Sequence, residues 1–365
     1  MKYPVFKPHV TQDDKNYVMK CLDEGWISSN GPYVEQFEKA FSNYLGVKYS
    51  ISVSNGTSAL EVALAGLGIN SGEVILPSFT IASCAYAIQR VGATPIFVDV
   101  DKDYLCIEPS IVKKKINKKT KAIMIVNMYG NTCDVDAFLK IRREYGIPIV
   151  EDCSENLGGS YSNKLSGSVF DVSTFSLYAN KTITSGEGGI VCTSDNEIRD
   201  KAKKYKNLDF DANRTFTHEN QAFNFRLSAP QCAMAYSQLQ RINSILEIKD
   251  KIFKNYLKYI DMNLLKPLKV RSNTRFVPWM NCFRVINYKS FQYEKFSEYM
   301  STKEIQVRPF FSSLESQKAF GKNEKNSDFI NSRSAQNDGF YLPSSLELKE
   351  ADISFIADIV NDFFK

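Results

Sequence analysis

A lysine among small hydroxyl residues is the first feature of the sequence that could do chemistry. Residues 173–189 read STFSLYANKTITSGEGG, so Lys181 lies between serines and threonines and precedes a glycine-rich turn and an apolar run at 190–192. A lone lysine is usually a surface residue. Here its neighbours are small and uncharged, and the glycines permit close backbone approach. Partial burial would lower the pKa of Lys181 and make its amine nucleophilic.

Two acidic residues end a short apolar run earlier in the chain. Glu151 and Asp152 directly follow Ile149 and Val150. Ligands of parallel α/β sheets gather at the carboxyl ends of strands. A buried carboxylate is costly unless it meets a charged or protonated partner, and the protonated ring nitrogen of a cofactor is such a partner. The plainer interpretation is a strand-end acid that caps the next helix.

The turn in SVSNGTSAL, residues 52–60, could hold a phosphate. A strand pattern ends there, a polar glycine turn follows, and a helix pattern begins. A helix N-terminus offers free backbone N–H groups and the positive end of the helix dipole, and Thr57 and Ser58 add hydroxyl donors. The plainer interpretation is a simple helix N-cap. The segment lacks the glycines and the lysine of a P-loop or a dinucleotide-binding turn.

The order of these three features favours one cofactor. A phosphate-holding turn, a strand-end Asp152 and a lysine in a serine-rich turn follow one another as in enzymes that use pyridoxal 5′-phosphate (PLP). In such enzymes the lysine forms a Schiff base with the cofactor, and the acid holds the protonated pyridine nitrogen. The sequence therefore predicts PLP as the cofactor, with Lys181 as its covalent attachment.

The elements that must position these residues form an alternating pattern. Short apolar runs at 50–53, 74–76, 95–98, 122–126 and 149–150 are separated by helix-like segments. In one of these segments, 58–66, Leu60, Ala63 and Leu64 share a helix face, and glycine ends the pattern. Continuous apolar strands separated by helices predict an α/β fold with a mostly parallel sheet covered on both faces.

A second region begins near residue 240. A lysine- and isoleucine-rich helix is expected from 239 to about 259, followed by β-like runs at 283–286 and 305–307 and a final helix at 351–364. This pattern is typical of a smaller α+β domain. We therefore predict two domains, a large cofactor-binding domain at 1–240 and a small C-terminal domain at 241–365.

The composition is that of a globular protein with a mild basic bias. Of 365 residues, 43% are hydrophobic and 24% charged, and the formal net charge of +5 fits an anionic small-molecule ligand. Binders of nucleic acid usually concentrate basic residues in a patch. The densest basic run, 113–121, has no interleaved aromatic residues, so it is interpreted as a solvated helix end. No nucleic-acid partner is expected.

The sequence also disfavours a membrane-spanning protein, a disulfide-stabilised protein and a metal-binding protein. The chain has no apolar run of about 18 residues, and its first residues lack the apolar segment of a signal peptide. Its eight cysteines are widely spaced without a CxxC pair, which indicates the reduced thiols of a cytoplasmic protein. With only His9 and His218 as histidines, no metal site is expected.

These motifs belong to a recognisable series. The chain resembles the sugar aminotransferases of the DegT/DnrJ/EryC1/StrS family, which have the PLP fold type I (aspartate-aminotransferase-like) architecture, and within that family it looks most like the branch that makes GDP-perosamine. The resemblance covers nearly the whole chain. The matching segments are 25–29, 54–57, 92–99, 151–153, 180–189, 224–227, 308–311 and 342–344.

The resemblance implies roles for the residues that would do the chemistry. Lys181 would form the Schiff base with PLP and move the proton during transamination. Asp152 would pair with the pyridine nitrogen. Glu155 would lie near the phenolic oxygen of the cofactor, where many relatives have Gln.

The resemblance also implies a phosphate site that two subunits share. Gly56, Thr57 and Ser176 would bind the phosphate of PLP, and Asn224 would reach it from the partner subunit. A homodimer is therefore expected, because each subunit would complete the other's active site.

Three positions depart from the family pattern and bear on the substrate. Ile81 stands where relatives usually place an aromatic ring over the cofactor, Asn127 replaces the usual histidine, and residues 312–315 replace a histidine-containing segment. Arg308 is a candidate contact for a diphosphate. A dehydratase branch of the family has histidine in place of the lysine, so Lys181 argues against that branch.

The resemblance implies a PLP-dependent aminotransferase, with glutamate as amino donor and a nucleotide-linked 4-keto-6-deoxy sugar as acceptor. The expected acceptor is GDP-4-keto-6-deoxymannose and the expected product GDP-perosamine, for a surface polysaccharide such as an O-antigen. A dTDP- or UDP-linked keto sugar remains the nearest alternative. A PLP-binding regulatory protein without turnover and an α/β protein without PLP are the alternatives from other classes.

Overall fold

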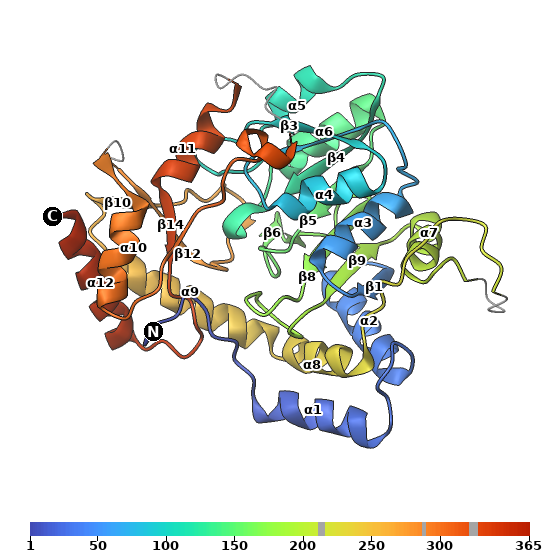
Figure 1. Ribbon diagram of the computed structural model, residues 1–365, viewed down its shortest axis with the longest axis horizontal. Coiled ribbons are helices and arrows are strands. Elements are labelled where there is room, and N and C mark those ends of the chain that lie inside the picture. The colour runs from blue at the N-terminus through green and yellow to red at the C-terminus, as the bar shows by residue number, and fades with distance from the viewer. Residues whose placement is uncertain (211–215, 287–289, 321–327) are drawn as a thin grey trace.

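A seven-stranded sheet forms the centre of the protein (Figure 1). The computed structural model describes residues 1–210, 216–286, 290–320 and 328–365. The strand order of the central sheet is β1-β9-β8-β5-β4-β2-β3. β9 is antiparallel to both β1 and β8, and the pairs from β8 to β3 are parallel. The strands are β1 (Tyr49–Val53), β2 (Glu73–Pro77), β3 (Thr94–Val98), β4 (Thr120–Val126), β5 (Ile149–Asp152), β8 (Val172–Ser176) and β9 (Gly189–Thr193).

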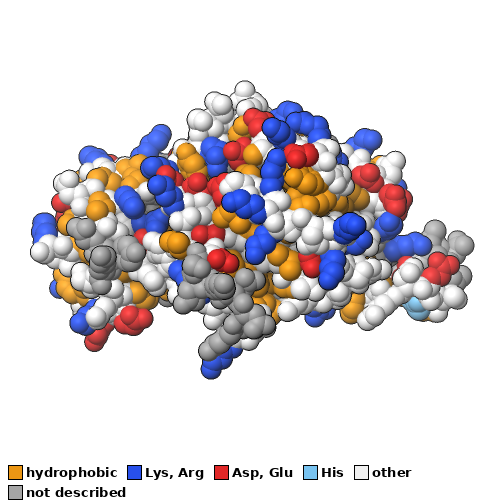
Figure 2. Space-filling model, turned by 90° about the horizontal axis from the view of Figure 1, so that it is seen from above, with side chains coloured by type: hydrophobic (Ala, Val, Ile, Leu, Met, Phe, Trp, Pro, Cys, Tyr) orange, Lys and Arg blue, Asp and Glu red, His pale blue; other side chains and the backbone are white. Residues whose placement is uncertain are grey.

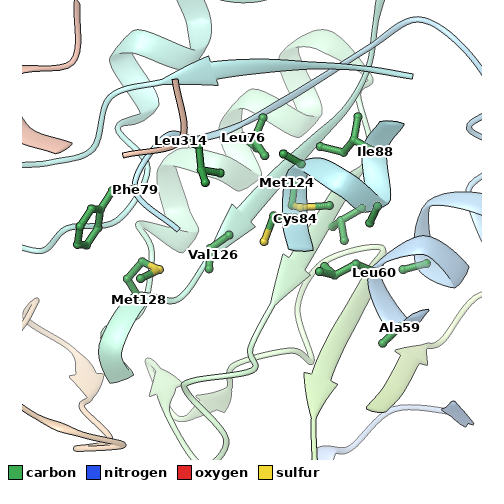
Figure 3. Packing of buried hydrophobic residues seen from close by; sticks show 14 of the residues in the cluster. Ala59, Leu60, Leu76, Phe79, Cys84, Ile88, Met124, Val126, Met128 and Leu314 are labelled. Atoms are coloured by element: carbon green, nitrogen blue, oxygen red, sulfur yellow. The ribbon is translucent and has the colours of Figure 1, made fainter. Parts of the chain in front are cut away.

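Helices cover both faces of this sheet. Alternate residues of its strands therefore pack in different hydrophobic clusters. On β4, Met124 and Val126 pack in one cluster with α3 and α4, while Ile123 and Ile125 pack in another with α5 and α6. Figure 3 shows part of the first cluster, with Leu60 of α3 beside the strands. The helices of this part are α1 (Gln12–Asp23), α2 (Pro32–Leu45), α3 (Gly56–Gly66), α4 (Ala82–Arg90), α5 (Pro109–Lys115), α6 (Val135–Tyr145), α7 (Asn196–Lys206) and α8 (Ala229–Gln240). The predicted α/β class with a mostly parallel sheet is confirmed.

The C-terminal region builds a second, antiparallel sheet in the order β10-β12-β14-β13. Its elements are α9 (Ile242–Tyr259), β10 (Leu265–Pro267), β12 (Asn281–Val285), α10 (Tyr293–Thr302), β13 (Arg308–Pro309), α11 (Ile330–Asp338), β14 (Gly339–Leu342) and α12 (Glu350–Phe364). In Figure 1, α9 runs from the end of α8 to α12, next to this sheet. A small third sheet joins the regions, with strands β6 (Ser160–Tyr161), β7 (Lys164–Leu165) and β11 (Thr274–Arg275).

Two segments lie across the predicted domain boundary. Tyr3 forms a parallel bridge with Ile305 and packs in the hydrophobic cluster of the C-terminal sheet. In the other direction, β11 of the C-terminal region pairs with β6. The division into 1–240 and 241–365 stays a prediction, and in space the first residues of the chain accompany the C-terminal sheet.

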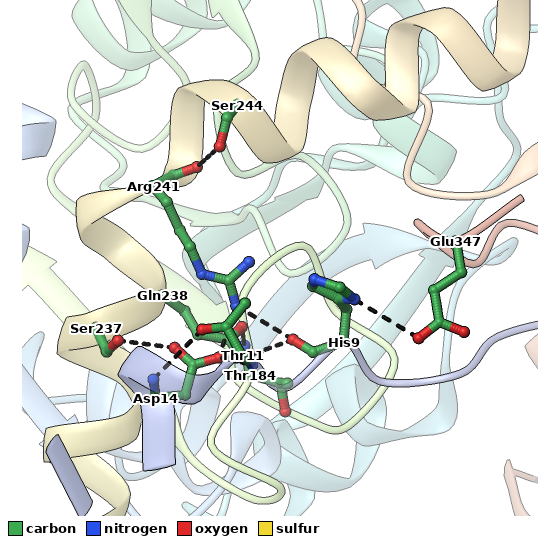
Figure 4. Close-up of polar contacts among 9 residues, drawn as sticks. All are labelled: His9, Thr11, Asp14, Thr184, Ser237, Gln238, Arg241, Ser244 and Glu347. Carbon is green, nitrogen blue, oxygen red and sulfur yellow. Dashed lines mark hydrogen bonds and ion pairs between the residues drawn. The ribbon is translucent and has the colours of Figure 1, made fainter. Parts of the chain in front are cut away.

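The helix predicted from 239 to about 259 is α9, which begins at Ile242, three residues later than predicted, because Arg241 separates it from α8. Arg241 leaves the helical conformation (φ −111°, ψ 18°) between α8 and α9. Its guanidinium donates to Asp14 Oδ2 (2.7 Å) and to the carbonyl of His9 (3.1 Å), as Figure 4 shows. The partners that hold Arg241 lie more than 220 residues away, so the local helix pattern could not reveal the break.

The run at 305–307, predicted as β-like, forms only the single bridge at Ile305, and the strand β13 follows it at Arg308–Pro309. The basic run at 113–121 contains the end of α5, as predicted, together with the following turn and the first two residues of β4. On the face in Figure 2, basic side chains are interspersed with acidic and apolar ones.

All eight cysteines are buried and unpaired. Within the described residues, no helix is long and apolar enough to cross a membrane.

Candidate active site

A cavity of about 730 Å³ opens where the strands β1, β5 and β8 end. The chain reaches it from the first turn of α3, from the segments after β5 and β8, and from β13. Eight of the ten residues predicted from the sequence line this cavity, and they are Gly56, Thr57, Ile81, Asp152, Glu155, Ser176, Lys181 and Arg308. The structure therefore brings together residues that lie more than 250 positions apart in the chain.

Lys181 is carried by a tightly bonded turn between β8 and β9. The Lys181 N–H donates to the carbonyl of Tyr178 (2.9 Å), and the Thr184 N–H donates to Gln238 Oε1 on α8 (3.0 Å). Gly188 has a φ of +141°, a conformation that side chains disfavour, and its carbonyl accepts from the Leu177 N–H (2.8 Å). These bonds fix the backbone from which the lysine enters the cavity.

The amine of Lys181 lies between a carboxylate and an aromatic ring. Its Nζ is 3.8 Å from Glu155 Oε1 and 3.9 Å from the ring centroid of Trp279. Burial lowers the pKa of Lys181, and the negative charge of Glu155 opposes that effect. A lysine in such a place is a better nucleophile at neutral pH than an exposed one.

Glu155 and Asp152 form the acidic side of the cavity. Glu155 Oε2 accepts from the Tyr129 N–H (3.0 Å), and burial raises the pKa of Glu155 to about 7, against the influence of Lys181. Asp152 Oδ1 accepts from the Ser154 N–H (2.9 Å), and Cys84 Sγ lies 3.5 Å from Asp152 Oδ2 as a donor. Both oxygens of Asp152 are thus oriented before any ligand binds.

The N-terminus of α3 fits a phosphate group. Asn55 caps the helix, accepting from the Ser58 N–H (2.8 Å), so the N-cap predicted as the plainer interpretation is present. A Cβ added at Gly56 would lie 3.0 Å from Ser176 Cβ, which is tighter than an ordinary contact, so glycine avoids crowding at this corner. The hydroxyls of Thr57 and Ser176 line the same cavity as the helix end. An anion is stabilised in such a cradle by N–H groups and the helix dipole.

Asn127 and Asn224 do not line this cavity. Asn127 is fully buried, and its amide donates to Glu151 Oε1 (2.8 Å) and accepts from the Cys133 N–H (2.9 Å). In this arrangement the side chain of Asn127 is committed to internal bonds, and its contact with the substrate stays a prediction. Asn224 is exposed, and its backbone bridges to Asn207.

Three further residues of the cavity wall were not found from the sequence. Arg90 donates to the buried Glu61, and its guanidinium lies over the ring of Phe225. Trp279 is 2% exposed, and its indole N–H donates to the Asn180 carbonyl (2.7 Å). Tyr341 of β14 completes the wall. None of them lies in a motif around Lys181, so only the tertiary structure reveals them.

No group of three or more histidine, cysteine or acidic side chains that could hold a metal ion occurs among the described residues.

Comparisons with known proteins agree with this geometry. The model of the DegT/DnrJ/EryC1/StrS aminotransferase family matches residues 8–361. The chain is 33% identical to GDP-perosamine synthase of Vibrio cholerae, over 99% of both chains. It is 34% identical to GDP-perosamine synthase of Escherichia coli O157:H7, over 100% of this chain and 99% of the relative.

A solved structure shows the same fold. The putative sugar aminotransferase Spr1654 from Streptococcus pneumoniae, in its PLP form, superposes with a TM-score of 0.92 at 22% identity, covering 98% of this chain and 97% of that one. The predicted family and fold are both confirmed: the chain belongs to the DegT/DnrJ/EryC1/StrS aminotransferase family.

Proposed function

We propose that this protein transfers an amino group from glutamate to C4 of GDP-4-keto-6-deoxymannose and so forms GDP-perosamine. The observation that carries this proposal is the 33–34% identity to two GDP-perosamine synthases over practically the full chain. The cavity supports it, because Lys181, Asp152 and the α3 phosphate cradle line one space. The product is an activated sugar for a surface polysaccharide such as an O-antigen.

The residues present fit PLP. Gly56, Thr57 and Ser176 would hold its phosphate at the α3 N-terminus, and Asp152 would face its ring nitrogen, with Glu155 on the acidic side of the cavity. When bound, the cofactor supplies an electron sink for the charge that develops as the donor loses its α-proton. Asp152 makes that sink effective because its fixed carboxylate stabilises a positive charge on the ring nitrogen.

Lys181 is the proposed acid and base of the reaction. With the cofactor bound, Lys181 would hold it covalently, and once a donor amine takes its place the Nζ would be free beside Glu155 and Trp279. This Nζ would take the proton from the donor α-carbon and return it as the amino group is handed on, and one water would release the donor skeleton as 2-oxoglutarate. The same residues work in the opposite direction on the sugar ketone, which becomes an amine. Arg308, at the cavity wall, is the proposed contact for the diphosphate.

A panel of nucleotide keto sugars tests this function. The purified protein, loaded with PLP and supplied with glutamate, is expected to convert GDP-4-keto-6-deoxymannose, with the amine product and 2-oxoglutarate detected by mass spectrometry. Faster conversion of a dTDP- or UDP-linked sugar would contradict the proposed acceptor. A protein that binds PLP but shows neither product nor a glutamate-dependent change of its absorption band would contradict catalysis altogether.

We further propose a homodimer with shared active sites. Asn224 is exposed and absent from the cavity of its own subunit, which supports a role at the partner's phosphate site. Two inactive variants, Lys181→Ala and Asn224→Asp, can be mixed. If Asn224 acts across the interface, each heterodimer has one intact site and activity partly returns. No recovery despite demonstrated subunit exchange would contradict the shared site.

We place the enzyme in the cytoplasm. Its eight cysteines are buried and unpaired, which suits a reducing compartment.

A further inference from the structure

Trp279 is fixed on several sides at the wall of the cavity. Its indole N–H donates to the Asn180 carbonyl (2.7 Å), which belongs to the residue directly before Lys181. Its own carbonyl accepts from Lys249 Nζ (2.9 Å) and from Ser344 Oγ (3.2 Å). The ring of Tyr129 is stacked on the indole, with an interplanar angle of 11°. An aromatic side chain held in this way cannot easily turn away from the lysine.

The face of the indole is turned to the lysine amine. Lys181 Nζ lies 3.9 Å from the ring centroid, well within the range of a cation–π interaction. Glu155 Oε1 lies 3.8 Å from the same Nζ. An ammonium between a carboxylate and a ring face is stabilised by both, but the ring has no basic atom and cannot take the proton.

We propose that Trp279 is a positioning residue of the reaction, which seats the Lys181 amine whenever that amine is not bonded to cofactor. The ring face holds the amine beside Glu155, and the indole N–H fixes the backbone of the lysine turn. The amine therefore stays at the reacting centre after the donor displaces it, instead of sampling the open cavity. This inference rests on the proposed role of Lys181.

The groups that influence the charge of Lys181 come from two elements. Asp152 ends β5 and Glu155 follows it, while Cys84 lies on α4. The two acids favour the charged lysine, as does the ring of Trp279, whereas burial disfavours it. Replacement of the ring by an aliphatic side chain keeps the burial and removes one stabilising contact, so the pKa of Lys181 should fall.

The titration of Lys181 in the protein without cofactor tests this directly. Acetic anhydride acetylates only unprotonated amines, and peptide mass spectrometry measures the labelling of Lys181 at each pH, with the exposed Lys140 as an internal reference. Trp279→Leu is expected to lower the midpoint of Lys181 by about one pH unit. Trp279→Phe should lower it by less, because a smaller ring remains.

Phe283→Leu is the matched control. Phe283 is also a fully buried aromatic residue, on β12, but it packs in the cluster of the C-terminal sheet and not at the cavity. The pH midpoint of Lys181 labelling in Phe283→Leu should equal that in the unmodified protein. An unchanged midpoint in Trp279→Leu, with circular dichroism showing a folded protein, would overturn the proposal.

Fluorescence gives a second measurement that needs no change at Trp279. The chain has two tryptophans, so Trp26→Phe leaves Trp279 as the sole indole. Its emission should change with pH at the midpoint found by labelling, and this change should vanish when Lys181→Met is added. Emission that does not follow Lys181 would overturn the proposal. A failure of the proposed function is read separately, from a cofactor absorption band that persists in Lys181→Ala.

Discussion

Two lysines, one partly buried and one fully buried, contact Trp279 at different points, and their surroundings differ sharply. Lys181 meets the face of the indole, lies beside Glu155 and lines the cavity. Lys249 of α9 is 1% exposed and donates to the carbonyl of Trp279 and to Ser344. In the described part of the chain, no acidic side chain pairs with Lys249.

The difference shows that burial alone does not make a lysine reactive. Burial lowers the pKa of both amines, and for Lys249 it does so to about 7. Only Lys181 has an open space for a substrate and acids that stabilise its charged form. The amine of Lys249 donates hydrogen bonds to Trp279 and Ser344. It therefore helps to fix the backbone that carries the indole. Lys181 is therefore placed to react with a ligand in the cavity, whereas Lys249 fixes Trp279, which lines that cavity.

Removal of the reactive amine should have the largest effect. Lys181→Ala is expected to abolish transamination and the visible absorption band of the bound cofactor, because no other amine lines the cavity in the described structure. Turnover with glutamate and the absorption spectrum are the measurements. Lys140→Ala, at an exposed position on α6, is the control and should keep both. A normal absorption band and normal turnover in Lys181→Ala would contradict the proposal that Lys181, unlike Lys249, is the reactive lysine.

Loss of Asp152, the acid proposed to face the ring nitrogen of the cofactor, should have the next largest effect. Asp152→Asn keeps the size of the side chain, and its amide can still accept from the Ser154 N–H. It removes the negative charge that is proposed to stabilise the ring nitrogen of the cofactor. We expect a fall in kcat of about a hundredfold, or about 3 kcal/mol, with the cofactor still bound. Near-normal turnover with an unchanged spectrum would show that Asp152 does not have this role.

The contrast between the two lysines also shows what the sequence could predict. Lys181 was identified because its neighbours in the chain are unusual, and Gly56 and Asp152 because each lies where a strand pattern ends. These signals are local, and so are the alternating patterns that predicted the sheet. The close approach of Gly56 to Ser176 explains why a residue without a side chain occupies this position.

The features missed by the sequence depend on contacts between distant segments. Trp279 lies 98 positions after Lys181 and reaches it only because the segment before β12 and the lysine turn meet at the cavity. Lys249 looks like any lysine of an amphipathic helix until Trp279 and Ser344 cover it. Asn127 is predicted near the substrate because it replaces the usual histidine of the family, and only the structure shows that its amide is bonded to Glu151 and Cys133.

Lys249→Met should change how stability depends on pH. The pKa of Lys249 is about 7 in the folded protein and near 10.5 in the unfolded chain. Between these values the unfolded state binds the extra proton, so this group makes stability rise with pH from about 7 to 10.5. Below pH 7 both states are charged, and the buried ammonium costs the most. The variant should lose this rise, up to about 1.4 kcal/mol for each pH unit.

Urea unfolding at several pH values between 7 and 10 measures this slope. The lost partner leaves the Trp279 carbonyl and Ser344 with fewer donors, which shifts the stability of Lys249→Met by a similar amount at every pH and leaves the slope unaffected. Lys140→Met, at the exposed position, should keep the slope of the unmodified protein. Equal slopes in Lys249→Met and the unmodified protein would mean that Lys249 is not a sealed, mostly neutral amine, and the contrast with Lys181 would fail.

Glu155→Gln should give the smallest shift and separates the two partners of the Lys181 amine. The amide oxygen of the variant can still accept from the Tyr129 N–H, so the backbone contact remains and only the charge is lost. Above about pH 7 the carboxylate of Glu155 is ionised and favours the ammonium of Lys181, 3.8 Å away. The labelling midpoint of Lys181 should therefore fall by about one pH unit, or about 1.4 kcal/mol. Glu144→Gln, which alters an exposed ion pair with Lys113, should cause no shift. A midpoint that stays in place or rises in Glu155→Gln would mean that the carboxylate does not stabilise the free amine, and the seat of Lys181 would then consist of the indole alone.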